Sequence, residues 1–257
     1  MRLYFKYVST QLKTNFMYRS STWMAMIGQT ISSMSALLGV MLLFSQYNSV
    51  GGYTFNQILI TFAVINFAFA FSEMVFRGFD QFDTLVRMGT LDALLLRPRN
   101  LALQICGQKI ETMKLGRTIF SVIILIVAVF ASNVQWNIIK AIVYIEMIIA
   151  GVIVFFGVYL FTSSITIFTI QKPEFVNVLV YGGRDLCFYP LDVFKKWITK
   201  FFTFIVPYGV FNYIPLRYLL FNENMLIAVF SPLMSVVFAF LMYLLFNFCM
   251  KFYKSAG

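Results

Sequence analysis

Residues 77–99 read RGFDQFDTLVRMGTLDALLLRPR and form the densest charged stretch of the chain. The stretch, called the island below, holds four arginines and three aspartates, and a long apolar run lies on either side of it. A charged segment between apolar runs of this length is typical of a loop between membrane spans. We therefore expect the rest of the chain to be a membrane domain that presents the island on one side of the membrane.

The composition supports this interpretation. Hydrophobic residues make up 60% of the 257 residues and charged residues 12%, whereas soluble domains are about a quarter charged. This predicts an all-α polytopic membrane protein with a single membrane domain over residues 1–257. The net charge of +10 arises mostly from residues that flank the apolar runs, which favours membrane orientation over nucleic-acid binding. With no histidine and three widely separated cysteines, neither a metal site nor a disulfide framework is expected.

Six membrane spans are predicted, together with three shorter segments. The spans are residues 21–46, 54–76, 114–132, 138–170, 174–190 and 225–250. The other segments are an interfacial helix at 1–19, a helical loop at 77–109 and a re-entrant segment at 191–222. In the first segment one face carries Phe5, Val8, Leu12 and Phe16, and another face carries Arg2, Lys6 and Lys13. This pattern is typical of a helix on an anionic membrane surface, although a basic topology anchor would look the same.

The distribution of positive charge predicts the orientation. With six spans, 14 of the 20 Lys and Arg residues lie on the side of the termini and the island. The positive-inside rule then places both termini and the island in the cytoplasm. The fifth span is interrupted by Gly182–Asp185, and a five-span alternative would move the lysines of residues 192–200 to the inside. We expect six spans on this charge count.

The island is expected to form two short helices. Asp80–Arg87 forms the first, with Asp83 and Arg87 among its charges, and Gly89 ends it. Thr90 is expected to cap the second helix, with Asp92 in its first turn and Pro98 after its end. The second helix offers four leucines, Leu91, Leu94, Leu95 and Leu96, which must contact lipid, the bundle or a partner.

Two stretches of the sequence resemble the permeases of type-two ABC exporters, in a branch that often pairs two related permease chains with one kind of ATPase. One is RGFDQFDTLVRMGTLDALLLRPRNLALQ from residue 77, in which Gly89, Leu91–Asp92, Leu94–Leu96 and Arg97–Pro98 match the motif of the intracellular loop. The other is YGGRDLCFYPLDVFKKWITKFFTFIVPYGVFNYIPLRYLL from residue 181, in which Tyr189–Leu191, Pro207 and Asn212–Tyr213 match. Lys195 departs from the pattern, since proline is more common there.

The resemblance implies a subunit without cofactors that works with ABC ATPase subunits, and ATP and magnesium then bind the ATPase. It also implies a second permease chain, identical or related, in the plasma membrane. The resemblance assigns the ATPase contact to Thr90, Leu91, Asp92, Leu94, Leu95, Arg97, Pro98 and Arg99, with Asp83, Arg87 and Gly89 in support. The alternative for the island is a solvated loop whose arginines only fix orientation.

Two acidic residues are candidates for the translocation path. Glu146 lies nine residues after Asn137, or about 13 Å into its span. A charge at that depth costs about 2.5–3.5 kcal/mol, so the side chain should face protein or water or be protonated. A buried structural hydrogen bond is the alternative. Glu73 precedes Arg77 by four residues, and this spacing predicts an ion pair within the helix.

The chain carries no GxxxxGK[ST] motif, so it is expected not to be an enzyme by itself. The leading hypothesis is an exporter permease that moves an amphipathic or hydrophobic substrate outward. A secondary transporter is the alternative, although the sequence offers only Glu146 as a midplane site and no clear repeat. A membrane subunit without transport is the third possibility.

Overall fold

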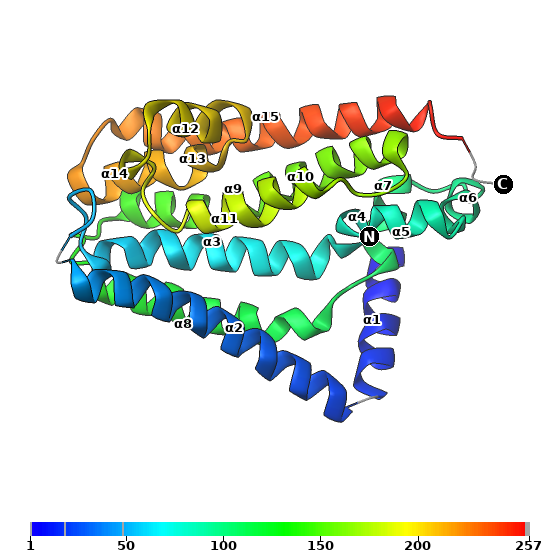
Figure 1. Ribbon diagram of the computed structural model, residues 1–257, viewed down its shortest axis with the longest axis horizontal. Coiled ribbons are helices and arrows are strands. Elements are labelled where there is room, and N and C mark those ends of the chain that lie inside the picture. The colour runs from blue at the N-terminus through cyan, green and yellow to red at the C-terminus, as the bar shows by residue number, and fades with distance from the viewer. Residues whose placement is uncertain (1, 18, 48, 255–257) are drawn as a thin grey trace.

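The computed structural model describes residues 2–17, 19–47 and 49–254, without the side chains of residues 2–6, 12, 15 and 16. Within these residues the chain is helical, apart from turns and an isolated bridge between Val50 and Tyr53. Five helices are long and apolar enough to cross a membrane (Figure 1). They are α2 (Arg19–Gln46), α3 (Phe55–Val75), α8 (Leu115–Ala131) with the turn η1 (Thr112–Lys114) before it, α9 (Ile138–Thr169) and α15 (Met225–Met250). This architecture fits the predicted all-α polytopic membrane protein.

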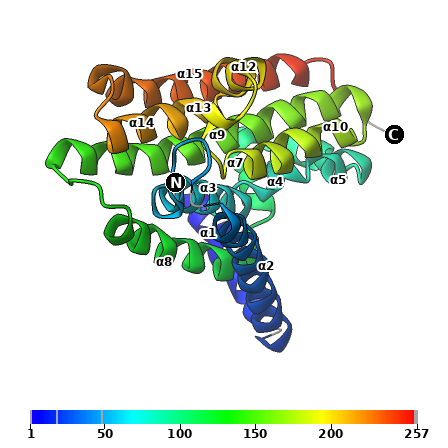
Figure 2. The same cartoon turned by 60° about the vertical axis from the view of Figure 1, so that its left-hand side comes forward.

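Helix α3 lies in the centre of the bundle. In its most apolar window 78% of the residues are buried, against 17% in α2 and 22% in α15. Small residues allow α3 and α9 to approach each other closely. A Cβ at Gly151 of α9 would lie only 2.8 Å from the Cβ of Ala68 of α3. Polar side chains also hold α3 in place: Asn66 donates to Ser33 of α2 over 2.7 Å, and Thr61 donates to the Phe188 carbonyl over 3.1 Å. Helix α2 diverges from the bundle, with α8 beside it (Figure 2).

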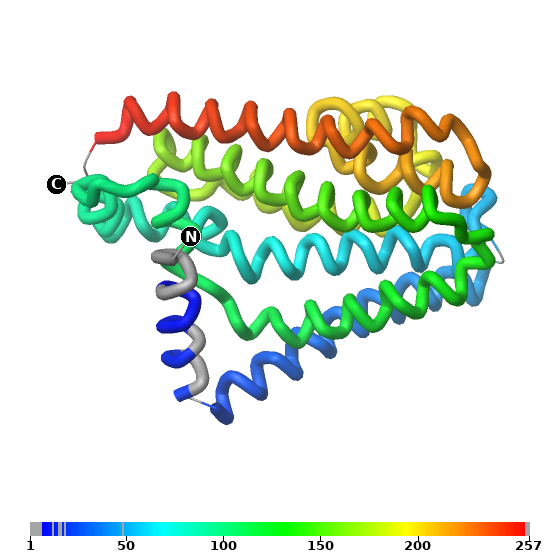
Figure 3. The backbone as a smooth tube through the Cα atoms, turned by 180° about the vertical axis from the view of Figure 1, so that it is seen from behind, coloured from blue at the N-terminus to red at the C-terminus, as the bar shows by residue number. Residues whose placement is uncertain are grey.

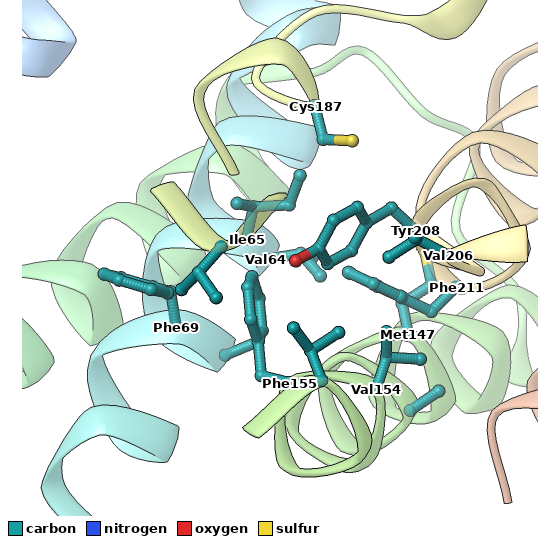
Figure 4. Close-up of a cluster of buried hydrophobic side chains, with 14 of the residues drawn as sticks. Val64, Ile65, Phe69, Met147, Val154, Phe155, Cys187, Val206, Tyr208 and Phe211 are labelled. Carbon is teal, nitrogen blue, oxygen red and sulfur yellow. The ribbon is translucent and has the colours of Figure 1, made fainter. Parts of the chain in front are cut away.

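An aromatic cluster joins α3, α9 and α13 (Tyr208–Phe211) (Figure 4). The Phe155 ring centroid lies 5.2 Å from that of Phe69 and 5.3 Å from that of Tyr208. Tyr208 is fully buried among these rings, and its hydroxyl donates to the Leu179 carbonyl over 3.3 Å. The cluster therefore fixes the broken segment that follows α9 against the two central spans.

Between α9 and α15 the chain is divided into short helices. Helix α10 (Glu174–Asn177), the π-helical turn η2 (Val178–Gly182) and α11 (Gly183–Leu186) follow one another along the bundle (Figure 1). At the start of this run, Lys172 contacts Asp80 of the island over 2.7 Å. After it, Asp192 accepts a hydrogen bond of 2.7 Å from Tyr53, in the turn between α2 and α3. Because Tyr53 and Asp80 lie beyond opposite ends of α3, the chain passes along the bundle from the island end to the opposite end, called the loop end.

The predicted helix at 174–190 is shorter in the structure than expected. It ends at Leu186, and residues 187–190 complete the passage in turns. A helix over 174–186 is about 20 Å long, less than the roughly 30 Å of a bilayer core. By length and composition it is therefore not one of the five span candidates.

The segment predicted to be re-entrant, residues 191–222, is a bent pair of helical arms. The first arm holds η3 (Leu191–Val193), α12 (Lys196–Lys200) and the π-helical turn η4 (Phe201–Ile205). The second holds α13 and α14 (Tyr213–Phe221). Within the two arms, Lys196–Ile205 and Tyr208–Phe221 meet near Pro207 at an angle of 84°, and this pair is long enough to count as a sixth candidate span or a re-entrant loop.

Helix α1 (Arg2–Met17) leaves the island end and runs across the direction of the spans (Figure 3). Its predicted apolar and basic faces rest largely on Arg2, Phe5, Lys6, Leu12 and Phe16, whose side chains lie outside the described residues. Of the remaining two side chains, Val8 is partly buried and Lys13 is exposed.

Candidate functional site

The island folds into three short helices rather than two, stacked at one end of the bundle. They are α4 (Arg77–Asp80), α5 (Phe82–Arg87) and α6 (Thr90–Leu95), and α7 (Leu101–Gln108) follows. Gly89 separates α5 from α6 and has a φ of 65°, which glycine adopts without the strain that a Cβ causes. Pro98 follows α6, and the Asn100 side chain caps α7 by accepting a hydrogen bond from the Leu103 amide over 3.2 Å.

The N-terminus of α6 differs from the prediction. Gly89, not Thr90, is its N-cap residue. The Thr90 hydroxyl donates to the Leu85 carbonyl over 3.2 Å, so it completes the end of α5 instead. Asp92 lies in the first turn of α6, as predicted.

The four leucines of α6 are divided between core and surface. Leu91 and Leu94 are 0% and 2% exposed, so of the three predicted alternatives, lipid, the bundle or a partner, these two contact the bundle. Their spacing of three residues places both on the helix face that packs into the bundle. Leu95 and Leu96 are 45% and 86% exposed, and Met88, before Gly89, is 72% exposed. The apolar surface of the island is therefore narrower than expected.

Basic residues border this apolar surface. Arg87 forms an exposed ion pair of 3.0 Å with Asp83, while Arg97, Pro98 and Arg99 follow the exposed leucines in the same loop and are themselves exposed. We call Met88, Leu95, Leu96, Arg97 and Arg99 the α6 surface.

Both ends of the described chain contact the island. Arg97 donates to the Tyr7 hydroxyl of α1 over 3.1 Å, and Gln11 of α1 donates to the carbonyl of Gln108, in the neighbouring α7, over 2.6 Å. Near the other terminus, Tyr253 lies beside Asp92; burial and the carboxylate of Asp92 raise the pKa of Tyr253. The island is thus held between α1 and the C-terminal residues.

Helix α7 connects the island to the bundle through close backbone contact. A Cβ at Gly78 of α4 would lie 1.9 Å from the Ile105 carbonyl oxygen, so only glycine fits. The buried Gln104 side chain donates to the carbonyls of Leu94 and Arg99 over 3.3 and 3.1 Å and so holds the end of α6. No local sequence pattern distinguishes Gln104 from the other polar residues of its segment.

A cluster of buried and partly buried charges lies at the start of the island. It consists of Glu73, Arg77, Asp80, Glu111, Lys114, Arg117 and Lys172. Glu73 is 1% exposed; its carboxylate lies 3.0 Å from Lys114 and 3.1 Å from Arg117. The cluster connects α3, α8 and the turn after α9 to α4.

Arg77 is the residue of the island that is most tightly held by this cluster. Its guanidinium lies 2.5 Å from Asp80, 2.6 Å from Glu111 and 3.5 Å from Glu73. Burial lowers its pKa, but the three carboxylates outweigh this effect and raise the pKa above the usual range, so the residue stays charged.

The sequence predicted only one pair of the cluster, Glu73 with Arg77, and the structure confirms it at 3.5 Å. Charged residues recur every three positions at Glu111, Lys114 and Arg117. This spacing is the sequence pattern that predicts a common polar face for them. Glu73 is enclosed among the cations of this cluster, and a contact of Glu73 with the translocation path stays a prediction.

Glu146, the other path candidate, lies on the surface of the bundle between α9 and α15. It lines a shallow groove of 160 Å³ with Pro232 and Leu233. Its Oε2 atom has no hydrogen-bond partner among the described residues. The alternative of a buried structural hydrogen bond is therefore not seen in the described part of the chain.

The chain matches one known protein family. The model of that family, described as ABC-2 family transporter protein, matches residues 30–257. No curated protein and no solved structure matches the chain.

Proposed function

The chain belongs to the ABC-2 family of transporter proteins, and from this premise we propose that it is the membrane permease of an ATP-driven exporter whose α6 surface binds the ATPase. Permeases of this family are transport subunits that work with an ABC ATPase. In our proposal a separate ATPase subunit binds ATP and magnesium, and a second permease chain, identical or related, completes the membrane part. The island and both termini then face the cytoplasm, and the chain moves an amphipathic or hydrophobic substrate outward across the plasma membrane.

One observation carries this proposal: exposed leucines flanked by arginines lie on short helices that are rigidly attached to the spans. Leu95 and Leu96 are exposed at the polar end of a membrane domain, and exposure of apolar side chains to water is unfavourable. A short helix that presents such residues suits a groove on a soluble partner. The α4–α7 backbone contact and the charge cluster would transmit a movement of the ATPase to α3, α8 and α9.

The burial of part of α6 changes the roles of the residues expected to contact the ATPase. Leu95, Arg97, Pro98 and Arg99 are the proposed contacts, with Leu96 and Met88 in addition. Leu91 and Leu94 anchor α6 to the core, Gly89 permits the turn, and Thr90 and Asp92 shape the helix start. Asp83 and Arg87 lie at the edge of the surface as an exposed pair.

The test is copurification and ATPase stimulation with the cognate ATPase, using the double variant Leu95→Glu/Leu96→Glu. We expect at least about a tenfold loss of affinity, because truncating a central anchor typically costs 2 kcal/mol or more. Thr169→Glu, at an exposed position of the island end, is the matched control and should leave binding unchanged. Normal binding and stimulation in the double variant would exclude the α6 surface as the contact. Transport in vesicles that is driven by a proton gradient without ATP would instead favour a secondary transporter.

A further inference from the structure

The first arm of the re-entrant segment carries unpaired positive charge. Lys195, Lys196 and Lys200 are exposed, and none forms an ion pair with any described residue. Lys196 and Lys200 are four residues apart on one helix, where like charges repel each other. A bound anion between these ammonium groups would remove that repulsion.

Large apolar side chains are exposed on the same arm. Trp197, Phe204 and Ile205 are 67%, 70% and 63% exposed, whereas Thr203 is 6% exposed and faces the bundle. Helix α12 lies on the outside of the bundle in both Figure 1 and Figure 2. We call Lys195, Lys196, Trp197, Lys200, Phe204 and Ile205 the α12 surface.

The combination of charge and apolar area restricts what can cover this surface. A soluble polyanion would match the lysines but would leave Trp197 and Phe204 in water. A second copy of the chain would need free carboxylates at its loop end. The acidic side chains described there are already engaged: Asp185 pairs with Arg184, Glu223 pairs with Arg217, and Asp192 accepts from Tyr53. An anionic amphiphile satisfies both the ammonium groups and the exposed rings.

We propose that the α12 surface binds the headgroups of anionic phospholipids in the leaflet at the loop end of the bundle. The phosphates lie against Lys196 and Lys200, and Trp197 lies at the boundary between headgroups and acyl chains, where tryptophan is enriched in membrane proteins. Each lysine close to an anionic membrane surface attracts it by about 1 kcal/mol, or about fivefold in affinity. Bound lipid would hold the first arm at a fixed depth. This proposal does not depend on the direction of transport or on the ATPase.

The experiment uses Trp197 as a local reporter of lipid composition. The full-length protein with Trp23→Phe and Trp136→Phe retains Trp197 as its only tryptophan, since the chain has three. It is reconstituted in phosphatidylcholine bilayers that contain either brominated phosphatidylglycerol or brominated phosphatidylcholine, which quench the indole on contact. We expect a preference of about fivefold or more for phosphatidylglycerol around Trp197. Lys195→Gln/Lys196→Gln/Lys200→Gln should reduce the preference to about one.

Lys251→Gln/Lys254→Gln is the matched control, because these lysines are exposed beyond the other end of α15. It should keep the preference seen in the parent. Equal quenching by both lipids in the parent would overturn the proposal. So would a loss of the phosphatidylglycerol preference in the control variant equal to the loss in the triple lysine variant. So would removal of the preference by soluble polyphosphate at constant ionic strength, since the surface would then bind a polyanion. If the tryptophan background does not fold, retention of phosphatidylglycerol by the otherwise wild-type chain and its triple lysine variant in native mass spectrometry gives the same comparison.

Discussion

Glu73 is the residue on which the charge cluster converges. One buried carboxylate meets Lys114 at 3.0 Å, Arg117 at 3.1 Å and Arg77 at 3.5 Å. Removing one member of a buried charge network leaves the others desolvated and unpaired, which typically costs 3–5 kcal/mol. Exposed ion pairs, by contrast, contribute about 1 kcal/mol or less.

Glu73→Ala should therefore destabilise the protein far more than Asp83→Ala. The second substitution removes the partner of Arg87, whose side chain is 48% exposed, and serves as the control. We expect losses of about 3–5 kcal/mol and at most about 1 kcal/mol in the free energy of unfolding, respectively. Thermal unfolding of the purified proteins in detergent measures both; similar shifts for the two variants would refute a structural role for the cluster.

At the residue scale the sequence predicts local pairs and little beyond them. The spacing of four residues between Glu73 and Arg77 predicted their ion pair, and Asp92 lies in the first turn of its helix as expected. The contact between Lys172 and Asp80 joins residues 92 positions apart, and no local pattern encodes it. Which leucines of α6 are buried and which are exposed also depends on tertiary packing, because the position of the bundle determines which face of α6 is covered.

At the scale of elements, the contact between α4 and α7 is the closest approach in the island. Only hydrogen occupies the space between the Gly78 Cα and the Ile105 carbonyl. Gly78→Ala must separate the two helices, and overpacking of this kind typically costs 1–3 kcal/mol. We expect a lower unfolding temperature and weaker stimulation of the ATPase, since the island loses its attachment to the bundle.

Gly28→Ala is the matched control for this prediction. Gly28 lies within α2, and a Cβ there would meet nothing within 4 Å. Alanine is favoured over glycine in a helix by up to about 1 kcal/mol, so this variant should be equally stable or slightly more stable. If both glycine variants unfold at the wild-type temperature, the close α4–α7 contact is not needed for stability.

The sequence locates most elements but not their exact form. Apolar length predicted the five long helices to within a few residues, with α8 beginning at Leu115 against a predicted 114. Gly89 and Pro98 marked the ends of α5 and α6 correctly. The additional break between α4 and α5, at Gln81, has no strong sequence signal. The early end of the 174–190 helix at Leu186 comes directly after Gly182–Asp185, where an interruption was predicted.

At the scale of the whole molecule, the island and the α12 surface lie at opposite ends of the bundle. The chain between Lys172 and Asp192 runs from one end of the bundle to the other, and the prediction of six spans treats this passage as a crossing of the membrane. The positive-inside rule predicts that the island lies on the inner side. With this orientation the lysines of the α12 surface would face outward, although their charge alone would favour the cytoplasm.

Cysteine labelling in intact cells tests this arrangement as a whole. Cys106, Cys187 and Cys249 are buried, so a membrane-impermeant maleimide should label the wild-type chain weakly. We expect Lys196→Cys to react from outside, and Arg99→Cys, at the exposed island, to react only after the membrane is permeabilised. Labelling of Arg99→Cys alone in intact cells would reverse the orientation and place the α6 surface out of reach of a cytoplasmic ATPase. Labelling of both variants only after permeabilisation would put the two ends on the same side, so the passage between Lys172 and Asp192 would not be a crossing of the membrane.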